Sequence, residues 1–132
     1  MQLTKNFHLT EFLRSETAQR LKIDNTPTAA AQVNLMHLAR YLQGFRDFVG
    51  YPIRITSGYR SPRLNSAVGG VPTSDHMKGL AADFYVLGIS PAESWQRLMA
   101  YRNYCRVEGI YDPVYQAIRY PAGHIHVGLR FK

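Results

Sequence analysis

The sequence lacks the features of several protein classes. It has one cysteine, Cys105, which excludes an internal disulfide and a zinc site built from several thiolates. No apolar stretch approaches the length of a membrane span or a signal-peptide core, so we expect no stable membrane insertion and no secretion signal. Acidic residues are few, 9 against 16 Lys and Arg, and the formal net charge is +7. That excess favours an anionic partner, either nucleic acid or an acidic wall polymer.

The apolar residues that are present suffice for one folded unit. They make up 45% of the 132 residues, which predicts a single domain over residues 1–132. The basic residues are scattered, and no nucleic-acid-binding motif accompanies them. We therefore expect a monomer without a nucleic-acid partner. A basic nucleic-acid-binding protein stays open as an alternative that charge alone supports.

Periodicity predicts helices in the first half of the chain and strands in the second. Residues 9–21 predict a first helix with Thr10 as its N-cap. Residues 29–49 predict a long helix, because apolar residues recur there every three or four positions. A further helix over residues 90–103 begins with Ser90 as its N-cap. Strands are predicted at 53–57, 80–86, 106–111, 114–120 and 124–131. This order predicts an α+β fold, with N-terminal helices packed on a small antiparallel sheet that has one inserted helix.

Ionisable side chains occupy one face of two predicted strands. Because side chains alternate along a strand, Asp83 lies on the polar face of residues 80–86, and His124 and His126 share the polar face of the last strand. If these strands pair, Asp83 and His126 converge, and His76 reaches them from the preceding loop. Two imidazoles and one carboxylate, with a position left for water, are the ligands of a catalytic zinc site.

The spacing by itself leaves a structural explanation open. His-x6-Asp occurs by chance, and an aspartate on a strand often pairs with an arginine, so the spacing supports metal binding and a structural role equally. In a site of two neutral imidazoles and one carboxylate, Zn²⁺ keeps a net positive charge and lowers the pKa of bound water towards about 7. We expect the small residues Gly79, Ala81 and Gly128 to leave room for a substrate beside the metal.

Three stretches, SGYRSPRLNSAVGG, SDHMKGLAADF and HIHVGL, resemble in order and spacing the zinc D-alanyl-D-alanine peptidase (M15) superfamily. The resemblance is strongest to its branch of bacterial and phage cell-wall peptidases. The signature Ser-x-His-x-x-Gly-x-Ala-x-Asp of that branch is matched by Ser74, His76, Gly79, Ala81 and Asp83. The N-terminal NFHLTEFLRSETAQRLKIDNTP is similar too, so the resemblance covers nearly the whole chain. It implies the zinc fold shared by hedgehog domains and these peptidases.

The resemblance implies an activity and a set of site residues. A Zn²⁺ cofactor would be held by His76, Asp83 and His126 in a metallopeptidase, either a carboxypeptidase or an endopeptidase, that cleaves amide bonds of peptidoglycan stem peptides. Arg60 matches the family arginine that faces the active site, where a guanidinium can stabilise an oxyanion or bind a substrate carboxylate. Ser74 matches a position that can bond to substrate; a turn-forming role is the alternative.

One position departs from the family pattern. Several members carry Glu or Asp, acting as general base, three residues before the last zinc-binding histidine, and this chain has Gly123 there. We expect His124, on the same strand face as His126, to accept the proton instead, with a supporting or ligand role as the alternative. Glu108 and Asp112 are further candidates. Because the acid is missing, a non-catalytic zinc-binding module on the same scaffold stays open.

The resemblance also predicts where the protein acts. Family members without a signal peptide are often phage or prophage lysis enzymes, released through a membrane pore that another protein makes. We therefore expect this protein to be made in the cytoplasm and to act on the cell wall, with peptidoglycan peptide as its partner.

Overall fold

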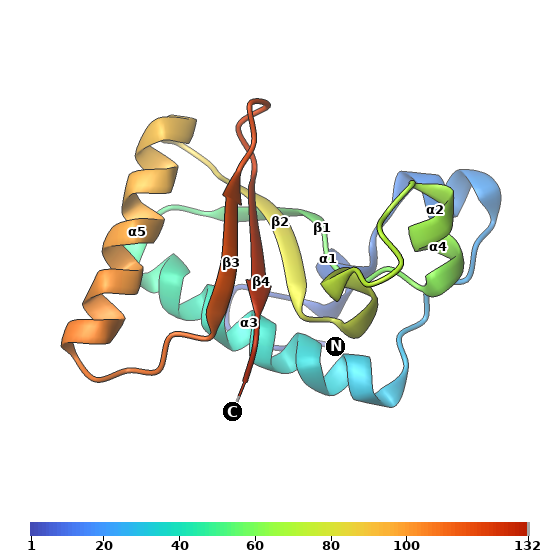
Figure 1. The fold of residues 1–132 in the computed structure, drawn as a ribbon, viewed down its shortest axis with the longest axis horizontal. Coiled ribbons are helices and arrows are strands. Elements are labelled where there is room, and N and C mark those ends of the chain that lie inside the picture. The colour runs from blue at the N-terminus through green and yellow to red at the C-terminus, as the bar shows by residue number, and fades with distance from the viewer. Residues whose placement is uncertain (132) are drawn as a thin grey trace.

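The structure, a computed structural model, describes residues 1–131. The two longest helices pack on one face of a four-stranded antiparallel sheet, and the short helices at residues 16–21 and 62–67 lie to one side of it (Figure 1). The helices are α1 Leu9–Leu13, α2 Glu16–Leu21, α3 Ala29–Val49, α4 Pro62–Ala67 and α5 Pro91–Val107, with a 3-10 helix η1 Asp75–Lys78. The strands are β1 Ile53–Ser57, β2 Ala81–Val86, β3 Val114–Arg119 and β4 Ile125–Leu129, in the order β1-β2-β4-β3. The α+β class predicted from the sequence is confirmed.

The long helix α3 supplies much of the core. Its apolar face carries the fully buried side chains Leu35, Leu38, Leu42 and Phe45, at the three- and four-residue spacing seen in the sequence. The helix ends at Gly50, whose positive φ of 76° allows the chain to leave in a left-handed conformation. In the part of the chain that the structure describes, no helix combines the length and apolar character needed to span a bilayer.

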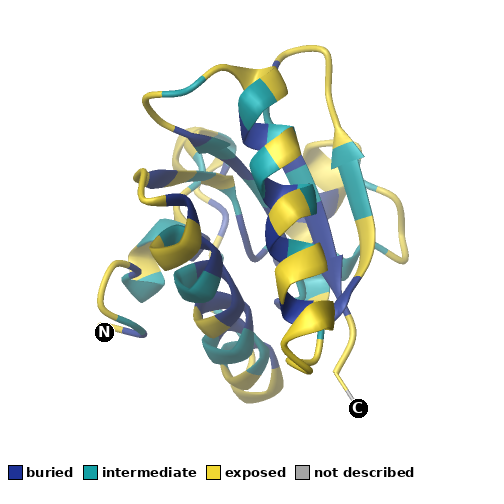
Figure 2. Cartoon of the chain, turned by 90° about the vertical axis from the view of Figure 1, so that its left-hand side faces the viewer, coloured by how far each residue is buried: buried dark blue, intermediate teal, exposed yellow. Residues whose placement is uncertain are grey.

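The sheet has a buried face and an open face. Phe84 of β2 and Ile125 and Val127 of β4 point towards the helices and are at most 1% exposed. They share one core with residues of α3 and α5, and Figure 2 shows the exposed positions of α5 on its outer side. The opposite face, which carries Asp83 and His126, is left for the site.

The helix predicted over residues 9–21 is two short helices. His8, not Thr10, is the N-cap of α1, because its ring Nδ1 accepts a hydrogen bond from the backbone N–H of Thr10 at 3.2 Å. Arg14 then has extended backbone angles, and Ser15 caps α2. The prediction of one helix was wrong because a second N-cap, Ser15, lies seven residues after His8 within a single apolar pattern.

The strand predicted at 106–111 was also wrong. Helix α5 continues to Val107, because Tyr101 and Cys105 extend its buried face by a further turn. The chain then turns at Gly109, whose φ is 70°. The alternation of residue types in this stretch therefore reflects the last turn of a helix and a loop.

Candidate metal centre and active site

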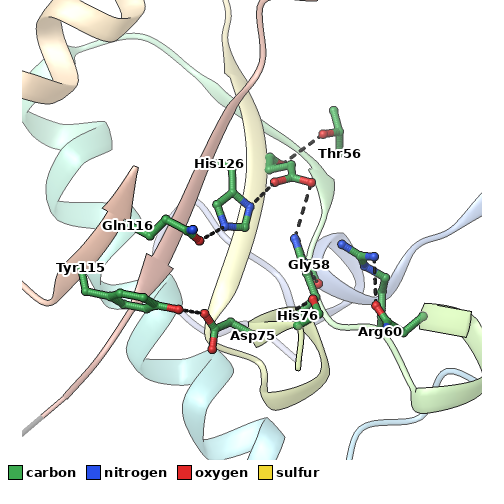
Figure 3. Close-up of polar contacts among 11 residues, drawn as sticks. Thr56, Gly58, Arg60, Asp75, His76, Tyr115, Gln116 and His126 are labelled. Carbon is green, nitrogen blue, oxygen red and sulfur yellow. Dashed lines mark hydrogen bonds and ion pairs between the residues drawn. The ribbon is translucent and has the colours of Figure 1, made fainter. Parts of the chain in front are cut away.

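Strand pairing brings two of the predicted ligands together. Antiparallel pairing of β2 with β4 sets Asp83 opposite His126. The Nδ1 of His126 lies 2.7 Å from Oδ1 of Asp83, and the Nε2 of His76 lies 3.5 Å from Oδ2 of the same carboxylate. One potential ligand atom of each residue lies within 4.8 Å of the other two. The three residues predicted as ligands therefore meet at one point, with His76 and His126 turned towards each other in Figure 3.

Backbone groups hold the His76 ring in place. The hydroxyl of Ser74 caps η1 by accepting a hydrogen bond from the N–H of His76 at 3.2 Å. The buried ring donates from Nδ1 to the carbonyl oxygen of Gly58 at 2.6 Å, which leaves Nε2 for the site. The next N–H along, that of Tyr59, donates to the carbonyl of Phe12 at 2.7 Å. Both sides of the Gly58–Tyr59 peptide unit are thus tied down.

A glutamine of the neighbouring strand holds the His126 ring. The Oε1 of Gln116 in β3 lies 3.1 Å from Nε2 of His126 and accepts a hydrogen bond from it. The register of β3 against β4 shifts between Val114 and Gln116, which sets Gln116 opposite Gly128. With Nε2 occupied in this way, the His126 nitrogen left for a ligand bond is Nδ1.

The donor set fits a divalent cation. When His76 Nδ1 and His126 Nε2 carry the ring protons, the nitrogens that face Asp83 present lone pairs to a carboxylate. Such a group of acceptors is stable only if both rings take up a second proton or if a cation lies between the three residues. Tetrahedral zinc ligands at about 2.1 Å lie roughly 3.4 Å from one another. The 3.5 Å between His76 Nε2 and Asp83 Oδ2 is close to this spacing, whereas the 2.7 Å between His126 Nδ1 and Asp83 Oδ1 is a hydrogen-bond distance that a bound ion would lengthen.

The Asp83 carboxyl group is held in its ionised form. Burial works against ionisation, but hydrogen bonds that the rings of His126 and His76 donate when their facing nitrogens carry protons outweigh burial and hold the pKa of Asp83 below its usual value. The hydroxyl of Thr56 donates to the backbone carbonyl of Asp83 at 3.2 Å and anchors this part of β2 to β1. An ionised carboxylate is the form that binds a metal.

A cavity of about 410 Å³ opens onto these three residues. Both residues that the resemblance placed near the active site, Arg60 and Ser74, line it. Its wall also includes Asp75, Tyr115, Gln116 and Tyr120. A substrate group that enters this cavity therefore meets the two histidines, Asp83 and the Arg60 guanidinium together.

One nitrogen of the Arg60 guanidinium is hydrogen-bonded within the protein, and another has no partner among the described residues. Its Nη1 donates to Oδ1 of Asn65 at 3.1 Å, and Asn65 is itself buried and donates to the carbonyl of Val71. The Nε of Arg60 is buried and has no hydrogen-bond partner among the described residues. Burial lowers the pKa of Arg60, while Asp83 acts in the opposite direction. Asn65 thus orders the loop, and the guanidinium keeps donors for an oxyanion or a carboxylate.

The predicted general base is not brought to the cavity. The ring of His124 stacks on that of Tyr120, with centroids 4.5 Å apart and planes inclined by 15°, and it lies against Tyr85. Among the described residues that line the cavity His124 is absent. Glu108 caps the end of α5, and Asp112 forms an ion pair with an arginine of that helix. The assignment of a base to any of these residues stays a prediction.

The small residues do not leave room for substrate, contrary to the expectation. A Cβ on Gly128 would lie 3.2 Å from the Tyr115 ring and 3.3 Å from the Asp75 carboxylate, so the space is filled by the protein's own side chains. Tyr115 donates its hydroxyl hydrogen bond to Asp75 there. Gly79 ends η1 with a φ of 73°, and a Cβ on it would lie 2.5 Å from a backbone oxygen of α3. Ala81 is fully buried.

The sequence analysis missed Gln116 and the Gly58 carbonyl. Alternation along the predicted strand 114–120 places Gln116 on the same face as Tyr120, and that was the available signal. Residue types do not indicate which backbone carbonyl will accept a side-chain hydrogen bond, as that of Gly58 does. Asp75 was not predicted either, because it occupies an unspecified position of the signature.

Two comparisons with known proteins bear on this site. The family model described as Peptidase M15 matches residues 5–127. Comparison with curated proteins finds no match. The matched range contains Arg60, His76, Asp83 and His126.

Proposed function

The chain belongs to the peptidase M15 family, and on that premise we propose that it is a zinc peptidase that hydrolyses an amide bond in peptidoglycan stem peptides. The observation that carries the proposal is the convergence of His76, Asp83 and His126 within 4.8 Å on the wall of a cavity. The outward nitrogen of each ring is bound to an oxygen of the protein, so the inward nitrogens are oriented for a metal.

Each residue of the cavity has a task in this proposal. His76 Nε2, the Asp83 carboxylate and His126 Nδ1 would hold the ion, and zinc in such a site supplies a Lewis acid and a nucleophilic water at neutral pH. Arg60 donates hydrogen bonds to the negative charge that develops on the substrate, because its donors face the same cavity. Ser74 positions His76 through its cap.

The choice of peptidoglycan rests on charge and on the resemblance. A net charge of +7 attracts an anionic wall polymer, and the scattered basic residues do not form the motif of a nucleic-acid-binding protein. We propose that the protein acts as a monomer on the cell wall after synthesis in the cytoplasm, as lysis enzymes of phages or prophages do.

One observation favours a second candidate, a zinc-binding module without catalysis. Gly123 occupies the position of the family's acidic base, with a φ of 103° that suits glycine, and His124 is stacked on Tyr120 instead of lining the cavity. In that case the same three residues bind metal and no bond is cleaved.

Metal analysis and digestion of purified peptidoglycan distinguish the candidates. We expect about one zinc per chain, and mass spectrometry of the digest should show stem peptides shortened by hydrolysis. The Asp83→Asn variant should show neither. Zinc binding without any cleavage product, over a range of pH, would identify the non-catalytic module, and absence of zinc from the wild type would refute both.

A further inference from the structure

A second, larger cavity is also lined by Arg60. Its volume is about 570 Å³, and it is bounded by the start of α2, by β1 and by the start of the loop that leads to α4. Three guanidinium groups line it, those of Arg14, Arg54 and Arg60; we call it the arginine cavity. Hydroxyl groups of Thr17, Thr56 and Ser57 also line it.

The positive charges of the arginine cavity are not neutralised by the protein. Within residues 1–131, none of the three arginines lies within ion-pairing distance of a carboxylate. Glu16 is the one acidic residue that lines the cavity, against three arginines. Arg14 and Arg54 are exposed, while Arg60 brings a buried Nε without a partner among the described residues. A concave surface with this balance attracts anions.

The arginine cavity and the cavity at the metal centre have one lining residue in common, Arg60. Thr56 lines the arginine cavity, and its hydroxyl donates to the backbone carbonyl of the ligand Asp83. A peptide bound at the metal centre can therefore extend past Arg60 along β1 and place further groups among the arginines.

We propose that the arginine cavity binds a carboxylate of the substrate peptide at a residue away from the scissile bond. The inference rests on the proposed peptide substrate. A guanidinium binds a carboxylate with two parallel hydrogen bonds, and the three arginines offer several such pairs of donors. The cavity would thus select acidic peptides over their amidated counterparts, whatever bond is cleaved.

Two synthetic stem peptides test the inference. One has a free carboxylate at a residue away from the scissile bond, and in the other that carboxylate is amidated; the affinities of the protein for the two peptides are compared. Calorimetry on chelator-treated protein prevents turnover, and circular dichroism verifies that each sample is folded. The wild type should bind the acidic peptide about tenfold more tightly than the amide. The double variant Arg14→Gln/Arg54→Gln should lose this preference. Arg63→Gln, which removes an exposed arginine of α4 outside both cavities, should keep it.

Equal affinity of the wild type for both peptides, no binding of either, or an unchanged preference in the double variant would overturn the inference. Competition by inorganic phosphate that depends on Arg14 and Arg54, together with equal affinity for both peptides, would assign the cavity to phosphate and overturn it as well. Cleavage with added zinc is scored separately, so a protein that prefers the acidic peptide and cleaves nothing contradicts only the proposed peptidase activity.

Discussion

The two faces of the β2–β4 strand pair share one backbone register and serve opposite purposes. On the inner face, Phe84, Ile125 and Val127 are at most 1% exposed and belong to the hydrophobic core. On the outer face, the side chains of Asp83 and His126 are 18% and 11% exposed and face a cavity. A shift of one residue in the pairing would exchange the two sets, so the core that folds the sheet also positions the ligands.

Substitutions on the two faces should therefore affect different properties, namely stability on the inner face and metal binding on the outer face. Loss of an inner side chain removes buried apolar area and creates a cavity, which lowers the free energy of unfolding. Loss of an outer side chain leaves the core intact and removes affinity for the metal. The substitutions below act on one face at a time.

The largest effect is expected from Asp83→Asn on the outer face. The substitution keeps the shape of the side chain and removes its charge, so zinc affinity should fall by more than about a thousandfold. Competition with a chromogenic chelator measures it. Asp47→Asn, at an exposed position of α3, is the matched control and should bind zinc normally. Zinc affinity within tenfold of the wild type would show that Asp83 is not a ligand.

Phe84→Ala, one residue along on the inner face, should act on stability instead. Removal of a fully buried phenylalanine should lower the free energy of unfolding by about 3–5 kcal/mol, measured by urea denaturation of the zinc-free protein. Tyr85→Ala on the outer face should cost clearly less, because Tyr85 is only half-buried. Similar losses for both variants would break the contrast between the faces.

Gln116→Ala should weaken zinc binding without loss of the site. The amide oxygen holds the His126 ring, and loss of such a support typically lowers metal affinity by about 10–100-fold. The same competition assay measures it, with the exposed Gln96→Ala of α5 as the control. An unchanged affinity would mean that β4 alone orients the ring.

The smallest effect is expected from His124→Ala. Its ring packs on Tyr120 and does not line the cavity, so peptidase activity should fall by less than about tenfold. Removal of a general base would lower kcat by about 10²–10⁴-fold. Activity of the variant on a stem peptide, at saturating substrate, decides between the two; a loss in the higher range would identify His124 as the base.

The sequence predicted the positions of the ligand residues on the outer face better than it predicted the groups that hold their side chains in place. Alternation along two strands was enough to place Asp83 and His126 on one side, and the structure pairs them directly. The partner of His126 on β3 depended on a register shift between Val114 and Gln116, and residue types carry no signal for such a shift. The N-cap role of His8 was not predicted, because histidine is not among the usual N-cap residues.

The helical layer shows the same limit. The apolar spacing of residues 29–49 correctly predicts the long helix α3, whereas the alternation over residues 106–111 predicts a strand where α5 ends and a loop follows. Six residues are too few to separate the two periods once a glycine interrupts them. The burial of Tyr101 and Cys105 decides that the helix continues to Val107, and this burial depends on tertiary packing.

The hydrogen bonds of the Gly58–Tyr59 peptide unit should indicate whether the metal site is occupied. Its carbonyl binds the His76 ring, and its amide hydrogen is donated to Phe12 of α1. An ion that draws electrons from the ring strengthens both bonds in series, since hydrogen bonds in a chain polarise one another. Deuterium should therefore replace the Tyr59 amide proton more slowly once zinc is loaded, and α1, whose Phe12 carbonyl accepts that proton, should become less prone to fraying.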